Sequence, residues 1–191
     1  MTGRTHDLAA FTALIYVVAG VPLHNISLAT GLVAITANLI GGIAPDIDQP
    51  TAPLWKNLPI GGLFGRVFDK LLGGHRFLSH SLIGLAIFGF GFHYLLNVLI
   101  PSFPYLNMTI IWWSFMIGYI SHLIMDTITR EGVPWLLPIP YKIGLPPFKE
   151  FRVQTGSWVE HLVVFPILLI MCGYLFYLHY HQFLILLHQI G

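Results

Sequence analysis

Five long apolar runs constrain what this 191-residue chain can fold into. Their limits are approximately 7–23, 26–44, 80–100, 109–128 and 160–178. A helix of about 20 mostly apolar residues crosses the hydrocarbon core of a bilayer, and charged residues make up only 9% of this chain. We therefore expect an all-α bundle of about five transmembrane helices that forms a single membrane-embedded domain, residues 1–191. The first run is the shortest, and its length leaves open whether it crosses the bilayer completely.

The basic residues are distributed unevenly along the chain. All nine lysines and arginines lie before the first run or in two connections, 46–79 and 129–158. With five crossings, these three places share one side of the membrane. Because connections rich in lysine and arginine stay in the cytoplasm, we expect the N-terminus on the cytoplasmic side and the C-terminus on the opposite side.

Histidine and carboxylate side chains gather on the same predicted side, because every run contributes at least one of them near its cytoplasmic end. They are His6, Asp46, Asp48, His75, His80, His122, Asp126 and Glu160. His122 and Asp126 lie four residues apart and therefore on one helix face, inside a run where an ionisable group costs about 3 kcal/mol. This pair is either half of a metal site or a buried hydrogen bond that joins two helices.

The number and type of these side chains indicate a metal centre. Four histidines and four carboxylates exceed the three protein ligands of a single catalytic zinc ion, and they suffice for two ions bridged by a carboxylate. Because the set lacks thiolates, it favours zinc, manganese or iron over copper(I). We expect a divalent cofactor, zinc or manganese, with up to two ions. The predicted ligands are His6, Asp46, Asp48, His75, His80, His122 and Asp126.

Four of the candidates have further predicted roles. Asp48 is alternatively a general base, and His75 alternatively orients another ligand. Arg76 would hold the anionic oxygens of a phosphoryl group in its fork, or else it contacts a lipid headgroup. Glu160 joins Asp48 and Arg76 as a predicted catalytic residue, and it equally fits a role in orienting a ligand.

Other chemistries fit the sequence less well. Cys172 is the single cysteine, which excludes a disulfide framework and a cysteine zinc site. Ser79 and Ser81 flank His80, but adjacent residues on a helix point in different directions, and the chain has no Gly-x-Ser-x-Gly elbow. Nucleic-acid binding is not expected, because the chain lacks a basic stripe.

The two basic connections differ in pattern. In 46–79, apolar residues recur at helical spacing around Arg66 and Lys70, namely Leu63, Phe64, Val67, Phe68, Leu71 and Leu72. This pattern predicts a short amphipathic helix in the membrane interface, or a loop helix that packs on the bundle. The connection 129–158 contains five prolines and therefore cannot be one long helix.

The candidate residues also occur in a recognisable order. It comprises His6, Pro45-Asp46-Ile47-Asp48, His75-Arg76, Ser79-His80-Ser81, Gly118-Tyr119-Ile120-Ser121-His122 with Asp126, Gly132-Val133-Pro134 and Glu160. With this pattern, over roughly residues 6–160, the chain resembles the YdjM-like family of bacterial inner-membrane proteins, which are described as membrane-bound, metal-dependent hydrolases. The resemblance implies a protein of the bacterial cytoplasmic membrane with metal-dependent hydrolase activity.

The expected reaction is metal-assisted hydrolysis of a phosphoester in a membrane lipid or lipid-linked substrate, because a site at headgroup depth meets lipid first. Two other functions stay open. A transporter for a metal ion or a proton would need polar residues through the bilayer, where the sequence offers little beyond Asn38 and His93. A non-catalytic membrane protein would use the metal for structure alone, but the excess of ligands and the presence of Arg76 favour catalysis.

Overall fold

The computed structural model describes residues 1–21, 26–52, 55, 61–71, 73, 76–99, 102–139 and 141–190. This part of the chain forms seven α-helices, namely α1 (Gly3–Gly20), α2 (Leu28–Ile43), α4 (Gly61–Leu71), α5 (Leu82–Leu99), α6 (Met108–Thr127), α7 (Phe165–Leu178) and α8 (Tyr180–Ile190). Shorter turns of helix are η1 (Ala44–Asp48), η3 (Lys149–Phe151) and the π-helical η4 (Glu160–Val164). The described residues contain two isolated β-bridges and no strand. The prediction of an all-α helix bundle is confirmed.

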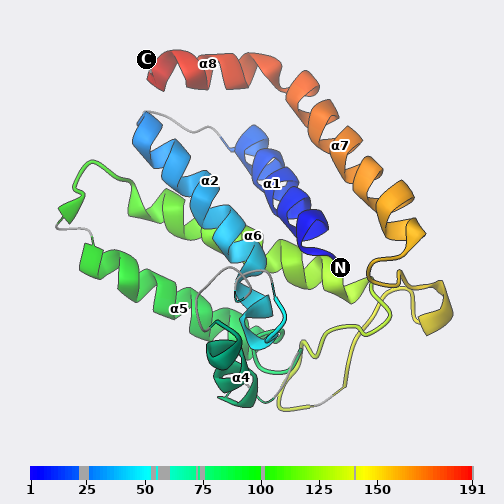
Figure 1. Cartoon of the computed structure of the whole chain (residues 1–191). Helices are drawn as coiled ribbons and strands as arrows, with labels where there is room; N and C mark the ends of the chain where they lie inside the picture. Colours follow the sequence, from blue (N-terminus) through cyan, green and yellow to red (C-terminus); the bar gives the residue numbers. More distant parts are fainter. Residues whose placement is uncertain are drawn as a thin grey trace.

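Four segments of the described chain are long and apolar enough to cross a membrane. They are Leu28–Asp48, Leu82–Leu99, Met108–Thr127 and Glu160–Leu178. The first predicted run, which forms α1, does not meet the same criterion, and its first two turns contain Arg4, His6 and Asp7. α1 nevertheless belongs to the bundle, because it packs against α2, α6 and α7 (Figure 1).

The contact between α2 and α6 is the most extensive in the bundle. Two glycines permit this close approach, because neither carries a side chain at the contact. A Cβ added to Gly118 would lie 2.0 Å from the backbone oxygen of Asn38, and one added to Gly41 would lie 2.1 Å from that of Phe115. The close approach brings the backbone of α2 within hydrogen-bonding distance of side chains on α6.

The apolar core follows α6 along its length. Phe115, Tyr119 and Leu123 are buried there. Phe92 of α5 stacks on Phe115 with ring centroids 4.2 Å apart. The hydroxyl of Tyr119 donates a hydrogen bond to the backbone oxygen of Ser79 at 2.5 Å, which fixes the loop before α5 against α6.

The two ends of the bundle differ in character. The N-terminal end of α1, the turn η1 after α2 and the C-terminal end of α6 lie at one end, together with α4 and the connection 129–158 (Figure 1). α8 lies at the opposite end, where it turns away from α7 (Figure 1). The candidate residues that these elements carry, His6, Asp46, Asp48, His122 and Asp126, therefore lie at the end away from α8 (Figure 1).

Candidate metal centre

α6 presents His122 and Asp126 one helical turn apart, and both side chains are buried. Nδ1 of His122 lies 2.6 Å from the backbone oxygen of Gly42 on α2. Because a carbonyl oxygen can only accept, Nδ1 carries the proton, and Nε2 of the neutral ring presents a lone pair. Among the described residues, this Nε2 has no hydrogen-bond partner.

The free nitrogen of His122 faces two carboxylates. It lies 3.6 Å from Oδ1 of Asp46 and 3.7 Å from Oδ2 of Asp126. His80 approaches the same two oxygens through its own Nε2, at 3.8 Å and 3.5 Å. Neighbouring ligands of a tetrahedral zinc ion with bonds of about 2.0 Å lie roughly 3.3 Å apart. Oδ1 of Asp46 therefore lies from both histidine nitrogens at nearly the spacing that a zinc ion requires, and all three ligand atoms lie within 4.8 Å of one another.

His6 extends this group from the first turns of α1. Its ring stacks on that of His122, with centroids 3.7 Å apart and planes inclined by 9°. Nε2 of His6 lies 3.3 Å from Oδ1 of Asp126, and the α-amino group of Met1 lies 2.7 Å from the same oxygen. The structure thus brings five of the predicted ligands together in one group, which we call the His/Asp cluster: His6, Asp46, His80, His122 and Asp126.

Asp126 lies at the centre of the cluster, with each oxygen turned to a different side. Oδ1 faces His6, whereas Oδ2 faces His80 and lies 2.7 Å from Nη2 of Arg76. Nη1 of Arg76 donates to the hydroxyl of Thr129 at 2.9 Å. Arg76 is buried, so its guanidinium group lies beside the cluster with its charge balanced by Asp126.

Asp48 lies behind His80, outside the ligand groups of the cluster. Its Oδ2 accepts hydrogen bonds from the backbone N–H of Arg76 at 3.0 Å and from the hydroxyl of Ser79, and it lies 3.4 Å from Nδ1 of His80. Burial alone would lower the pKa of His80, but its interactions with Asp126 and Asp48 raise that pKa to about 8. A carboxylate in this position orients a metal-binding histidine, so the geometry favours that role over the predicted roles of ligand or general base.

Glu160 is fully buried but holds the start of α1 instead of joining the cluster. Its Oε1 accepts from the backbone N–H and hydroxyl of Thr2 and from the hydroxyl of Thr5, each at 2.7 Å. Its Oε2 accepts from the backbone N–H of Gly156 at 2.7 Å. A carboxylate at a helix N-terminus is stabilised by the helix dipole. The predicted catalytic residue therefore positions α1, and with it His6.

Comparison with known proteins places the chain in a family. It matches the family described as "YdjM inner membrane protein" over residues 1–182. The chain belongs to this family. It is 31% identical over 184 residues to "Uncharacterized protein YvsG" of Bacillus subtilis (strain 168), an alignment that covers 95% of this chain and 98% of that protein. No solved structure matches the chain.

A second relative carries the family's name. The chain is 33% identical over 130 residues to "Inner membrane protein YdjM" of Escherichia coli (strain K12), an alignment that covers 63% of this chain and 56% of that protein. The predicted membership of the YdjM family is thus confirmed, and the chain is an inner membrane protein with several membrane-spanning helices.

The structure also identifies residues that the sequence did not single out for these roles. Gly42 orients His122 through its carbonyl, Thr129 binds Arg76, and Ser79, weighed only as a nucleophile, holds Asp48. The sequence did contain one sign of the contact with Gly42. Gly118 lies one turn before His122, and a glycine inside a buried helix indicates close contact with another backbone. His75 lies outside the described residues, so its role as a ligand stays a prediction.

The donor set of the cluster fits a divalent metal ion. Three imidazoles and two carboxylates offer nitrogen and oxygen ligands, which suit zinc and manganese. His122 and His80 are each oriented through Nδ1, by a carbonyl and by a carboxylate respectively, as metal-binding histidines usually are. In the part of the chain that the structure describes, Nε2 of His122 faces two carboxylate oxygens and has no hydrogen-bond partner, and a cation between these atoms would bind all three.

Proposed function

We propose that this YdjM-family protein is a membrane-bound, metal-dependent hydrolase that acts on a phosphoester of a lipid or lipid-linked substrate at the cytoplasmic headgroup layer. The observation that carries the proposal is the lone pair of His122 Nε2, which is buried and directed at Asp46 and Asp126. Arg76 balances the charge of Asp126 at 2.7 Å, but Nε2 of His122 has no hydrogen-bond partner among the described residues, and an unsatisfied buried polar atom is unfavourable. A structural hydrogen bond between the side chains of His122 and Asp126 does not account for it, because Nε2 lies 3.7 Å from Oδ2.

The ligand atoms of the cluster fall into two groups, and we infer one ion position in each. His122 offers one ring nitrogen, since its Nδ1 is engaged by Gly42, so it can serve only one ion. Asp46, His80 and His122 would hold that ion, and His6 with Oδ1 of Asp126 would contribute to a second. The α-amino group of Met1 lies 3.0 Å from Nε2 of His6 and 2.7 Å from this Oδ1, so the second ion would take its place. Asp126 presents its two oxygens to the two groups, as a bridging carboxylate does in two-metal hydrolases.

The residues around the cluster suit phosphoester hydrolysis. A bound divalent ion would lower the pKa of a water molecule and polarise a phosphoryl oxygen. Arg76 presents a guanidinium group within 2.7 Å of Asp126 and would pair with the anionic oxygens of the substrate. Asp48 holds the ring of His80 in place from the opposite side. The chain thus supplies ligands, their orientation and a fixed positive charge.

The connection that follows α6 supports a lipid substrate. It starts next to the cluster, where Thr129 contacts Arg76. Its aromatic residues Tyr141, Phe148, Phe151 and Trp158 are exposed, and exposed aromatic side chains of membrane proteins gather at the headgroup level. This connection also contains four of the nine lysines and arginines, which supports a cytoplasmic position for this end of the bundle.

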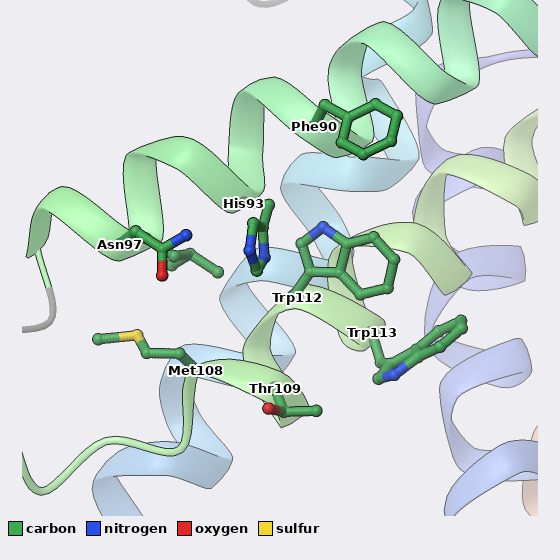
Figure 2. A pocket seen from close by; sticks show the side chains of 8 residues that line it. Phe90, His93, Asn97, Met108, Thr109, Trp112 and Trp113 are labelled. Carbon is green, nitrogen blue, oxygen red and sulfur yellow. The ribbon is translucent and has the colours of Figure 1, made fainter.

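The transporter alternative would need polar side chains that continue through the bundle. The side-chain amide of Asn38 is engaged by the backbone oxygen of Ser114. His93 is exposed on α5 and lines a pocket of about 440 Å³ between α5 and α6, beside Trp112 and Asn97 (Figure 2). Its ring lies 6.2 Å from that of Trp112 in this pocket, and the other pocket residues labelled in Figure 2 carry no charge.

The deciding experiment measures metal and activity on the same purified protein. We expect more than one zinc or manganese ion per chain, and hydrolysis in a screen of phospholipids and generic phosphodiesters. Asp126→Asn removes the charge that a cation needs and should lower the metal content and abolish hydrolysis. A metal-free protein whose melting temperature does not rise on adding zinc or manganese would refute the site, because binding to the folded state alone must stabilise it.

A further inference from the structure

The two sides of α4 differ in what covers them. Gly61 and Gly65 pack closely on the segment before the helix: a Cβ added to Gly61 would lie 2.0 Å from the backbone oxygen of Trp55, and one added to Gly65 would lie 2.7 Å from Cα of Pro50. Phe68 stacks on the ring of Trp55 with centroids 5.5 Å apart. This side of α4 is therefore joined to the rest of the protein.

A second side of α4 is apolar and exposed. Leu63, Val67 and Leu71 follow one another at four-residue spacing, which places them in one stripe, and they are 58%, 46% and 72% exposed. Arg66 and Lys70 are exposed as well. At about 100° per residue, these two residues border the stripe. An apolar stripe bordered by basic residues is typical of a helix that lies in the membrane interface.

The course of the chain also places α4 at a membrane surface. The helix lies between two segments that are long and apolar enough to cross the membrane, Leu28–Asp48 and Leu82–Leu99. It lies at the end of the bundle that contains the N-terminus (Figure 1). The sequence allowed either an interfacial helix or a loop helix packed on the bundle, and the exposed stripe favours the interfacial one.

We propose that α4 is a surface-lying membrane anchor that binds anionic lipid. Leu63, Val67 and Leu71 enter the boundary between headgroups and acyl chains, while Arg66 and Lys70 extend to the phosphates of anionic headgroups. The proposal does not depend on hydrolase activity and would stand if the His/Asp cluster bound no metal.

The anchor is connected to the cluster through Trp55. Its indole Nε1 donates to the backbone oxygen of Ile47 at 3.1 Å. Ile47 lies between Asp46 and Asp48 in the turn η1. Lipid binding by α4 would therefore hold the turn that carries both carboxylates.

The position of α4 can be tested with a fluorescent label on the full chain in nanodiscs that contain phosphatidylglycerol. In a Cys172→Ser background, the label is attached at Val67→Cys in the stripe, or at Gly62→Cys as the matched control, an exposed position away from the stripe with nothing within 4 Å of its Cβ site. We expect acyl-chain spin-labelled lipid to quench the label at position 67 and aqueous iodide to quench the label at position 62. Equal access of iodide to both labels would overturn the proposal. Protection of position 67 from both quenchers, with cross-linking between two chains, would overturn it in favour of a second copy.

A second measurement tests the recognition of anionic lipid. Quenching of the label at position 67 by the spin-labelled lipid reports the ratio of membrane-docked to undocked α4. Replacing both basic residues, Arg66→Gln with Lys70→Gln, should lower this ratio by roughly fivefold per charge in phosphatidylglycerol nanodiscs. The same double variant should match the parent in nanodiscs of phosphatidylcholine alone, where the headgroup has no net charge. If the double variant had the same ratio of docked to undocked α4 as the parent in both lipids, the two charges would have no role in lipid binding.

Discussion

The ring of His122 is held by the backbone of Gly42, with 2.6 Å between Nδ1 and the carbonyl oxygen. This hydrogen bond crosses the contact between α6 and α2, where Gly118 allows the two backbones to approach. It fixes the tautomer of the ring and directs Nε2 into the His/Asp cluster. The close packing of α2 on α6 thereby determines which nitrogen of the His122 ring carries the proton and which one presents a lone pair.

Gly118→Ala should separate α2 from α6, because the added Cβ would lie 2.0 Å from the backbone oxygen of Asn38. We expect a loss of about 1–3 kcal/mol in stability, as for other overpacked sites, and weaker metal binding as His122 moves away from Gly42. Thermal melting in detergent and metal titration measure the two effects. Gly91→Ala is the matched control, since nothing lies within 4 Å of its Cβ position and alanine favours a helix. Equal melting temperatures for the two variants would contradict this account.

Arg76→Ala separates catalysis from metal binding. Arginine does not coordinate a cation, so the metal content should stay unchanged. Hydrolysis should fall by ~10²–10³-fold, the typical loss when an electrostatic contact to the transition state is removed. His93→Ala on the exposed side of α5 is the control and should spare both metal and activity. If instead His93→Ala abolished function and Arg76→Ala had no effect, a pathway through the membrane would be the better explanation.

Glu160→Gln tests whether the carboxylate positions α1. The amide can accept hydrogen bonds through one oxygen only, so its NH₂ group would face either the Gly156 N–H or the donors of Thr2 and Thr5. We expect a loss of about 1–3 kcal/mol in stability, the usual cost of a buried unsatisfied group, and a lower metal affinity because His6 lies on α1. Glu150→Gln, at an exposed position, should change neither. A stable Glu160→Gln protein with full metal content would show that Glu160 does not position His6.

Metal affinity should depend on pH through His80. The pKa of its ring in the fold, about 8, is higher than the ordinary value of 6.5. In the metal-free protein, the stabilisation from the protonated ring is therefore fully present below pH 6.5 and is lost as the pH rises through about 8. A metal ion needs the neutral ring, so the affinity for manganese should rise by up to ~tenfold per unit up to about pH 8 and then level off. Calorimetric titration across this range measures it, and a flat profile would contradict the assignment of His80 as a ligand.

The topology prediction rests on the lysines and arginines, which all lie before the first run or in the connections 46–79 and 129–158. A reporter fused after Gly191 should report a periplasmic position. A cytoplasmic reading would indicate an even number of crossings. Because four segments of the described chain meet the criterion for crossing and α1 does not, this measurement also decides whether α1 counts as a crossing.

The sequence by itself determined the helices and the set of candidate ligands. Apolar runs near 20 residues leave the backbone no alternative to helix in a bilayer, so the crossings at Leu28–Asp48 and Met108–Thr127 follow from composition. The spacing of His122 and Asp126 placed both on one face. The alternation of crossings predicted that His6, Asp46 and His80 would lie at the same end as this pair, and the structure brings all five together.

Only the tertiary structure decided what each polar group contacts. Glu160 and Asp48 are carboxylates like Asp46, yet Glu160 caps α1 and Asp48 supports His80. Their partners, Thr2 and the loop before α5, are distant in sequence. A buried polar group takes whichever donor the packing brings within about 3 Å, and that depends on close backbone contacts such as the one at Gly118. Helical periodicity determines which residues share a face, whereas hydrogen-bond partners depend on how those faces pack.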